Sequence, residues 1–268
     1  MTAIALTIAG SDSSGGAGIQ ADLKTFSVLG VFGMTAITAI TAQNTLGVKS
    51  SLALEPKLVR EQIDVASSDI QVDACKTGML ANAAIIETVA DAIRSSKLQP
   101  YVCDPVMFSK SGAKLLSDDA VDALRKKLFP LATVITPNRR EAALLAGVDA
   151  TGLTTVAAAK DACRRLIGMG GKTVIVKGIA VEDQMVDVFF DGREFLEFAD
   201  AAHANEKSHG SGCAFSAAIT AGLANRLELI PAIDQAKQLV TMAIQYSDGQ
   251  GRGTAPVNVL AFAPKKAK

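Results

Sequence analysis

A glycine-rich turn directly before a helical pattern is the stretch of the sequence best suited to chemistry. SHGSGCAFS covers residues 208–216, with Gly210 and Gly212 on either side of Ser211 and Cys213 at the start of an apolar helical pattern. Successive backbone N–H groups at a helix start can bind an anion, and glycine lets the anion approach closely. One interpretation is a phosphate site, and the other is a loop that only begins a helix. The turn alone favours neither.

Cys213 could be a nucleophile, a base, a redox thiol or a small core residue. A helix N-terminus lowers the pKa of a thiol, so its position favours thiolate character. A dyad with His209 would suit a hydrolase, but no Asn or Asp partner is identifiable and the motif is not G-x-S-x-G. The apolar positions that follow have helical spacing and predict an amphipathic helix over about 213–225. The other cysteines lie on apolar patterns and are predicted to be core residues: Cys75, Cys103 and Cys163.

Two acids and a lysine directly follow apolar runs. Asp104 lies in D-P-V-M, and Glu141 lies in T-P-N-R-R-E, where Asn138 suits a helix start. The two acids could hold Mg²⁺, which takes one or two carboxylates together with phosphates and waters. Glu141 by itself would be explained as a first-turn acid that favours the helix dipole. Lys177, beside Gly178, could reach a transferring phosphoryl group or be a surface lysine with a buried stem.

The segments around these residues predict a mostly parallel sheet. Apolar, β-branched runs alternate with helical patterns, which is typical of a parallel sheet covered by helices on both faces. Predicted strands cover residues 3–9, 34–40, 72–76, 101–103, 133–135 and 173–177, with a hairpin formed by 185–190 and 194–198 around Asp191-Gly192. Predicted helices cover residues 18–29, 56–68, 82–95, 118–128, 138–146, 154–168, 213–225 and 231–247.

Ligands of such sheets bind at the carboxyl ends of the strands, so the loops after the strands are the candidate site. These loops are 10–18, 42–44, 77–79, 104–107, 136–141 and 177–178. The first is rich in glycine but has no G-K-[ST] and is not a Walker A loop. Neither glycine-rich loop matches the G-x-G-x-x-G pattern of a dinucleotide site. Anion binding by backbone N–H groups therefore remains the common prediction for both loops.

Composition limits the class of protein. The 268 residues suit one large α/β domain covering 1–268, and 49% hydrophobic with 4% aromatic residues predicts an aliphatic, alanine-rich core. Lys and Arg together number 27, as do Asp and Glu, which argues against a partner in nucleic acid or a membrane surface. The cysteines form no C-x-x-C, and two histidines are too few for the common zinc sites. With no apolar run of about 18 residues, we expect a reduced, cytoplasmic enzyme.

Several motifs together resemble the hydroxymethylpyrimidine/phosphomethylpyrimidine kinases of thiamin biosynthesis, within the ribokinase-like superfamily. The resemblance covers nearly the whole chain. Its markers are AGSDSSGGAGIQADLKTF (9–26), TAQNT (41–45), KTGML (76–80), DPVM (104–107), TPN and Glu in 136–141, VKG (176–178), and HGSGC with SAAI in 209–219. It implies a three-layer α/β/α fold with a central, mostly parallel sheet. It also implies a homodimer, which the residues themselves do not show.

The resemblance further implies a kinase that uses ATP and Mg²⁺. Its acceptor would be 4-amino-5-hydroxymethyl-2-methylpyrimidine, and the same site would then convert the monophosphate to the diphosphate. By this resemblance Gln43 reads the aminopyrimidine edge, and Asp22 lies near the substrate. The ring would be walled by Gly10, Ala17, Met79 and Val106.

The same resemblance assigns the phosphoryl end of the site. The amides of Gly210, Ser211, Gly212 and Cys213 would hold the migrating phosphoryl group together with Lys177. Asp104 and Glu141 would organise Mg²⁺, and Cys213 would stand by the reacting hydroxyl, where relatives use an aspartate base. On the nucleotide side the implied residues are Asn138, Lys177 and Gly212.

The sequence departs from the family pattern at two positions. Ile179 follows Gly178 where family members usually have a second glycine, and Ser211 replaces the usual threonine. Two alternatives stay open beside the pyrimidine kinase. One is a pyridoxal kinase of the same branch, and the other is a non-catalytic domain that senses the pyrimidine phosphate. Gln43 and Met79 favour the pyrimidine, and the presence of Lys177 favours catalysis.

Overall fold

The computed structural model describes residues 1–109, 111–117, 119–149, 152–201 and 209–263. These residues form a nine-stranded sheet in the order β3-β2-β1-β4-β5-β6-β7-β8-β9. The strands are β1 (Ile4–Asp12), β2 (Phe32–Asn44), β3 (Gly47–Ala53), β4 (Ala74–Thr77), β5 (Tyr101–Cys103), β6 (Val134–Ile135), β7 (Val174–Val181), β8 (Gln184–Phe190) and β9 (Phe195–Ala201). In this order, each neighbouring pair of strands from β2 through β1, β4, β5 and β6 to β7 is parallel. The pairs β3–β2, β7–β8 and β8–β9 are antiparallel.

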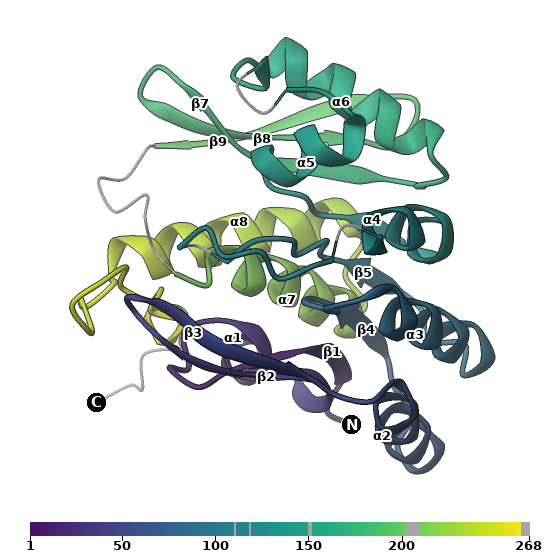
Figure 1. Cartoon of the computed structure of the whole chain (residues 1–268). Helices are drawn as coiled ribbons and strands as arrows, with labels where there is room; N and C mark the ends of the chain where they lie inside the picture. Colours follow the sequence, from purple (N-terminus) through teal and green to yellow (C-terminus); the bar gives the residue numbers. More distant parts are fainter. Residues whose placement is uncertain (110, 118, 150–151, 202–208, 264–268) are drawn as a thin grey trace.

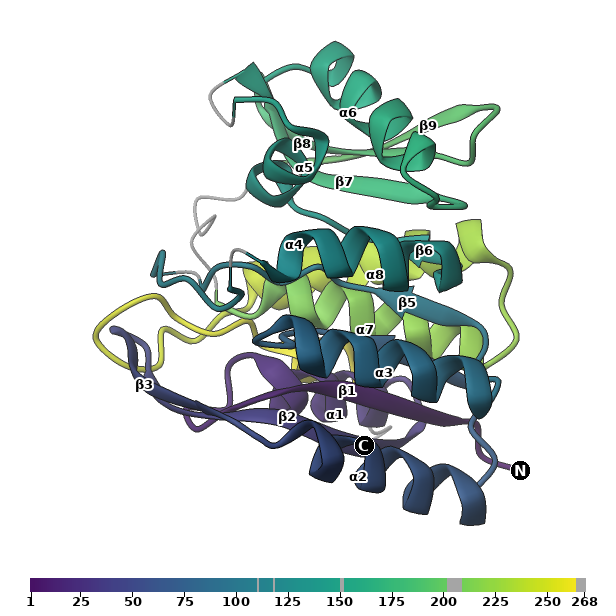
Figure 2. The same ribbon diagram turned by 45° about the vertical axis from the view of Figure 1, so that its right-hand side comes forward.

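Helices cover both faces of the sheet, as Figures 1 and 2 show. On one face lie α1 (Gly18–Val28), α7 (Ser211–Ala224) and α8 (Leu229–Gln245). On the other lie α2 (Pro56–Asp69), α3 (Ala83–Ser95), α4 (Ala120–Ala123), α5 (Arg139–Ala146) and α6 (Val156–Gly168). The predicted three-layer α/β/α fold with a mostly parallel sheet is therefore confirmed.

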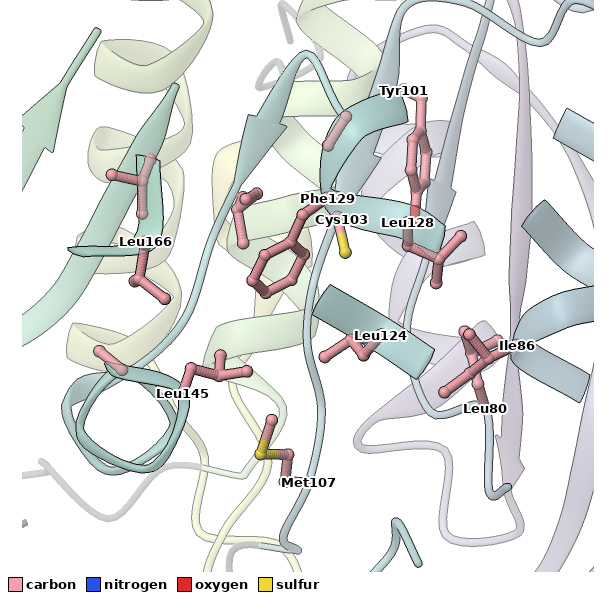
Figure 3. Packing of buried hydrophobic residues seen from close by; sticks show 14 of the residues in the cluster. Leu80, Ile86, Tyr101, Cys103, Met107, Leu124, Leu128, Phe129, Leu145 and Leu166 are labelled. Atoms are coloured by element: carbon pink, nitrogen blue, oxygen red, sulfur yellow. The ribbon is translucent and has the colours of Figure 1, made fainter. Parts of the chain in front are cut away.

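The core is aliphatic and rich in alanine, as the composition predicts. Side chains from α3, β5 and the segment 120–131 meet on one face of the sheet, where Tyr101, Leu128 and Phe129 are fully buried (Figure 3). Each such side chain stabilises the fold by about 1.5–3 kcal/mol through its removal from water. On the opposite face α7 and α8 approach so closely that a Cβ added to Gly222 would lie only 2.8 Å from the Ala232 Cβ. The central strands are thus held rigidly from both sides.

Three predicted elements differ from the structure. The 213–225 helix begins at Ser211 and is buried on nearly all sides, so the predicted amphipathic pattern is wrong. It lies between the sheet, α1 and α8, which leaves it no solvent face. The predicted strand 34–40 continues to Asn44 and turns back as β3, an exposed strand that its polar sequence concealed. The predicted helix 118–128 consists of α4 and a π-helical turn, Leu124–Leu128, and Asp118 lies outside the described residues.

Candidate active site

The carboxyl ends of the central strands open into one cavity. Every residue predicted for the site lines it, namely Gly10, Ala17, Asp22, Gln43, Met79, Asp104, Val106, Asn138, Glu141, Lys177, Gly210, Ser211, Gly212 and Cys213. The parallel strands bring these residues together because their polar carboxyl ends all lie at the same edge of the sheet. The cavity has two ends, named for the roles that the motif resemblance implies. The acceptor end lies at Gln43 and Met79, and the phosphoryl end at Lys177 and Gly212.

Lys177 is buried at the phosphoryl end, with 9% of the residue exposed. Its Nζ lies 3.4 Å from Asp104 Oδ1 and 5.4 Å from the centre of the Phe215 ring. A Cβ added to Gly212 would lie 3.6 Å from the same nitrogen, which places the ammonium beside the start of α7. The alternative of a surface lysine is therefore wrong, because the ammonium faces the cavity and its carboxylate partner.

The turn before α7 needs glycine for a steric reason. Gly210 has φ +84°, and a Cβ there would come within 1.8 Å of the carbonyl oxygen of Gly16. The turn is thus packed directly against the glycine-rich loop after β1. Gly210 is the N-cap and has no side chain to accept from the first N–H groups of α7, whose residues line the cavity. The two glycine-rich loops form one wall of the site.

Asp104 and Glu141 also line the cavity, and Asp104 contacts α7. Ser216 Oγ donates to Asp104 Oδ2 at 2.9 Å, and Thr136 Oγ1 lies 3.3 Å from Oδ1. Burial and the charge of Asp104 raise the pKa of Glu141 to about 7, although Lys177 lowers it. Two buried carboxyl groups that repel each other in this way are suited to a cation placed between them.

Glu141 also has the ordinary role expected of a first-turn acid. Asn138 Oδ1 accepts from the Glu141 backbone N–H at 3.0 Å, and Glu141 Oε2 accepts from the Asn138 backbone N–H at 2.9 Å. This capping box fixes the start of α5. The side-chain oxygen of Asn138 is occupied by the cap, so its amide NH₂ group is the part that can face a ligand.

A buried ion pair that sequence reasoning missed lies beneath the acceptor end. Lys76 Nζ contacts Asp22 Oδ1 at 2.7 Å, and both side chains are fully buried. Thr7 Oγ1 donates to Asp22 Oδ2 at 2.6 Å. Burial raises the pKa of Asp22, although the Lys76 ammonium opposes this. Burial by itself would lower the pKa of Lys76, but the charges of Asp22, Cys213 and Asp104 outweigh it, so the pKa of Lys76 is raised. Lys76, at the end of the predicted strand 72–76 and the start of KTGML, was the signal for this pair.

Cys213 does not have the thiolate character that its position predicts. The residue is partly exposed to the cavity, but desolvation by the surrounding protein raises its pKa to about 12, and the nearby Lys76 ammonium only partly offsets this. The helix N-terminus is therefore outweighed by the loss of water and by the charges of Asp22 and Asp104. The other three cysteines are fully buried, as predicted.

The acceptor end is built around Gln43 and Met79. A Cβ at Gly10 would lie 3.0 Å from the Met79 sulfur, and Thr38 Oγ1 holds the Met79 carbonyl at 2.5 Å. The hydrogen-bond partners found for the His209 side chain are Asp12 and Gln43, not Cys213. Nothing in the described contacts supports a cysteine–histidine dyad.

The far side of the cavity was not predicted from the sequence. It is lined by residues of β8, β9 and α8, among them Met185, Asp187, Asp200, Lys237, Val240 and Ile244. Asp187 accepts from the Gly178 N–H at 2.8 Å and from Lys237 Nζ at 2.9 Å. Ile179, which departs from the family pattern, is fully buried in the core, and the strand continues past it to Val181. Most of these residues lie inside the predicted hairpin and the last predicted helix, not in the loops directly after the strands, so the strand-end pattern did not single them out.

The described residues contain neither a ready-made metal cluster nor a membrane-spanning helix. No group of three or more His, Cys, Asp or Glu side chains in this part of the chain could hold a metal ion by itself. None of the helices formed by these residues is both long and apolar enough to cross a membrane. A cation at Asp104 and Glu141 would thus need further ligands from a bound molecule or water.

Comparison with known proteins agrees with this geometry. A curated hydroxymethylpyrimidine/phosphomethylpyrimidine kinase of Synechococcus elongatus is 47% identical over 256 residues, covering 95% of this chain and 96% of the relative. The ADP complex of Bacillus subtilis pyridoxal kinase superposes with a TM-score of 0.89 at 40% identity, covering 97% and 98%. Phosphomethylpyrimidine kinase of Clostridium difficile 630 superposes with a TM-score of 0.79 at 40% identity, covering 90% and 99%. Residues 12–258 match the model of the phosphomethylpyrimidine kinase family, and the chain belongs to that family.

Proposed function

We propose that this chain is a two-step kinase that phosphorylates 4-amino-5-hydroxymethyl-2-methylpyrimidine and then its monophosphate, with ATP and Mg²⁺, in thiamin diphosphate biosynthesis. The proposal rests mainly on the cavity itself. At one end it has the Gln43 amide and the apolar Met79 side chain, and at the other the Lys177 ammonium and the helix N-terminus at Gly212. We also propose that residues 1–268 act as a single domain, since one sheet runs through it, and that it works in the cytoplasm, where its unpaired thiols remain reduced.

Phosphoryl transfer at this site depends on position and charge rather than on covalent chemistry. The Lys177 ammonium and the first amides of α7 would hold the moving phosphoryl group from two sides. A hydroxymethyl group that is held at the acceptor end then faces that group at short range. In the second step the monophosphate takes the place of the hydroxyl as acceptor, within the same pair of anion-binding walls.

Asp104 and Glu141 would hold Mg²⁺ beside the Lys177 ammonium. The fit rests on burial and on the charge of Asp104, which together raise the pKa of Glu141, and a cation relieves the repulsion between the two carboxylates. When bound, Mg²⁺ neutralises phosphate charge, and nucleotide phosphates and waters complete its ligands. Asp104, Lys177 and Ser216 form a fixed network that keeps the carboxylate oriented.

Cys213 is proposed as a wall of the pocket rather than a base, because its thiol stays protonated near neutral pH. Cys213→Ser is expected to keep kcat within about tenfold of the unchanged protein and to show the same pH profile between pH 6 and 9. Cys213→Asp, which adds a carboxylate near Asp22 and Asp104, serves as the contrasting variant and should lose more. A Ser variant with a large, pH-dependent loss of kcat at unchanged KM would assign the thiol to proton transfer.

A coupled ATP-consumption assay with three acceptors tests the proposal. Turnover is expected with the hydroxymethylpyrimidine and with its monophosphate. Turnover with pyridoxal alone would instead favour the pyridoxal kinase alternative. The structural similarity to the Bacillus subtilis pyridoxal kinase is the reason to include this acceptor. Binding of the pyrimidine phosphate without any ATP turnover would favour the non-catalytic sensing domain.

We propose that the chain forms a homodimer through the β2–β3 hairpin. Ile40 and Leu52 are paired in register, so they face the same side, and they are 50% and 67% exposed. Leu46 at the turn is 60% exposed. Exposed apolar side chains grouped on an edge strand are typical of a covered surface.

Leu52→Lys tests this surface. A lysine there should weaken the dimer about 30-fold or more, the effect of a loss of about 2 kcal/mol at a central interface position. Light scattering across a concentration series measures the mass. Leu144→Lys, at an exposed leucine on α5, is the matched control and should not change it. A monomeric unchanged protein, or equal effects of both variants, would contradict the hairpin interface.

A further inference from the structure

Three polar side chains from distant parts of the chain meet at the acceptor end. Asp12 ends β1, Gln43 lies at the end of β2, and His209 precedes α7. His209 Nε2 lies 2.8 Å from Asp12 Oδ2 and 3.2 Å from Gln43 Nε2. Asp12 and His209 are 3% and 7% exposed, and all three residues line the cavity. The proposed function gives Gln43 a role but gives none to Asp12 or His209.

The contacts of Asp12 decide where the histidine proton lies. Its carboxylate accepts from the backbone N–H groups of Ser14 and Ala17, at 2.9 and 2.8 Å, and from Ser14 Oγ at 2.8 Å. Burial alone would raise the pKa of Asp12, but the hydrogen bonds from His209 and Ser14 lower it below its usual value. An ionised carboxylate only accepts hydrogen bonds. His209 Nε2 therefore carries a hydrogen and donates to Asp12.

This proton fixes the orientation of the Gln43 amide. A donor at His209 Nε2 cannot face the NH₂ group of Gln43, so the amide oxygen must take the position beside the histidine. The structure places Gln43 Nε2 beside His209 and Gln43 Oε1 3.2 Å from Thr41 Oγ1. The oxygen and nitrogen of an amide are assigned from their hydrogen-bond partners, so these partners decide the order. Because Thr41 donates its own hydrogen to the Ser11 carbonyl at 2.9 Å, its oxygen is free to accept from an NH₂ group. Both neighbours require the same order, with oxygen toward His209 and nitrogen toward Thr41.

The His209 ring is held so that it can impose this order. Its backbone N–H donates to the Ala255 carbonyl at 2.7 Å, and its carbonyl accepts from the Val257 N–H at 3.0 Å. The ring packs against the loop after β1, where a Cβ at Gly16 would lie 2.4 Å from Cδ2. Backbone bonds on one side and close packing on the other thus leave the ring little freedom.

We propose that His209 is a positioning residue that sets which way round the acceptor ring binds, by fixing the order of donor and acceptor on the Gln43 amide. The inference rests on the proposed function, in which Gln43 pairs with the aminopyrimidine edge. That edge carries an amino donor beside a ring-nitrogen acceptor, and the groups that flank it are the 5-hydroxymethyl and the 2-methyl. Reversal of the amide would pair with the ring turned over, which exchanges those two groups. The unreactive methyl would then face the phosphoryl end.

Two variants of equal length separate this role from simple packing. His209→Gln places an amide where the ring Nε2 lies and can still donate to Asp12. His209→Met fills the same space without a donor. We expect kcat/KM for the pyrimidine to fall about tenfold in His209→Met and to stay within about threefold in His209→Gln, while the KM for ATP is unchanged in both.

An analogue of the substrate without the 4-amino group provides the control within the assay. It cannot form the paired contact, so His209→Met should lose much less with it than with the aminopyrimidine. Equal losses with both acceptors, or equal activity of the two variants, would overturn the role of His209. If the unchanged protein does not phosphorylate the pyrimidine at all, the proposed function fails instead, so the two failures are distinguishable.

The position of the His209 proton can be measured without an activity assay. The sequence contains two histidines, His203 and His209. In ¹⁵N NMR spectra of histidine-labelled protein, the resonances that disappear in His209→Gln belong to His209. We expect its Nε2 to be protonated from pH 7 to 8. An Nε2 that carries a lone pair in this range would remove the reason for the amide order and overturn the inference.

Discussion

Replacement of Lys177 by alanine is expected to lower kcat for phosphoryl transfer about 100- to 1,000-fold, the usual loss when one preorganised charge is removed from a transition state. The reason is its position, buried between the Asp104 carboxylate and the start of α7. Folding should persist, because Asp104 still accepts hydrogen bonds from Ser216 and Thr136. Single-turnover kinetics at saturating ATP measures the loss.

Lys237→Ala is the matched control for Lys177→Ala. Lys237 lines the same cavity and pairs with an aspartate, Asp187, at 2.9 Å, but on its far side. Its removal should cost less than about tenfold in kcat. If Lys177→Ala keeps more than a tenth of the activity, or both variants lose equally, the role given to Lys177 is wrong.

Replacement of Lys76 by methionine is expected to reduce the free energy of unfolding by about 3–5 kcal/mol, because it leaves the buried Asp22 carboxyl without its cation. The loss should depend on pH. With the ammonium gone, burial raises the pKa of folded Asp22 further above that of the unfolded chain. A group of this kind stabilises the fold below the unfolded pKa and loses that contribution as the pH rises through the folded pKa. Lys76→Met should therefore be less stable at pH 8 than at pH 6.

Chemical denaturation at both pH values measures this effect. The double variant Lys76→Met/Asp22→Leu removes both charges and should recover most of the stability at pH 8, although it is expected to be inactive. A single variant that loses under about 1 kcal/mol would show that the pair contributes little. A double variant no more stable than the single one would show that packing, not charge, is the cause.

The strand-end residues of the site could be predicted from the sequence because parallel strands bring their carboxyl ends together. Asp104, Glu141 and Lys177 are far apart in the chain, yet each directly follows an apolar run, and that pattern alone places them at one edge. Motif similarity added the acceptor end, where Gln43 and Met79 have no pattern that chemistry alone would single out.

What the sequence did not predict depends on burial and tertiary packing. The expected thiolate at Cys213 follows from the helix dipole, but its raised pKa follows from desolvation, which only the packed structure defines. The strand β3 has an exposed, polar sequence, and its pairing with β2 was therefore hidden. Asp12 and Lys76 had visible motifs, but their partners His209 and Asp22 are 197 and 54 residues away. No local sequence pattern predicts contacts between residues so far apart in the chain.

One cavity is proposed to carry out both phosphorylations, and a ³¹P NMR time course tests this most directly. With the hydroxymethylpyrimidine, ATP and Mg²⁺ in one sample, the monophosphate resonance should appear first and then give way to the two resonances of the diphosphate. Lys177→Ala should slow both steps by a similar factor. A reaction that stops at the monophosphate, or a Lys177→Ala variant that loses only one of the two steps, would contradict a single two-step site.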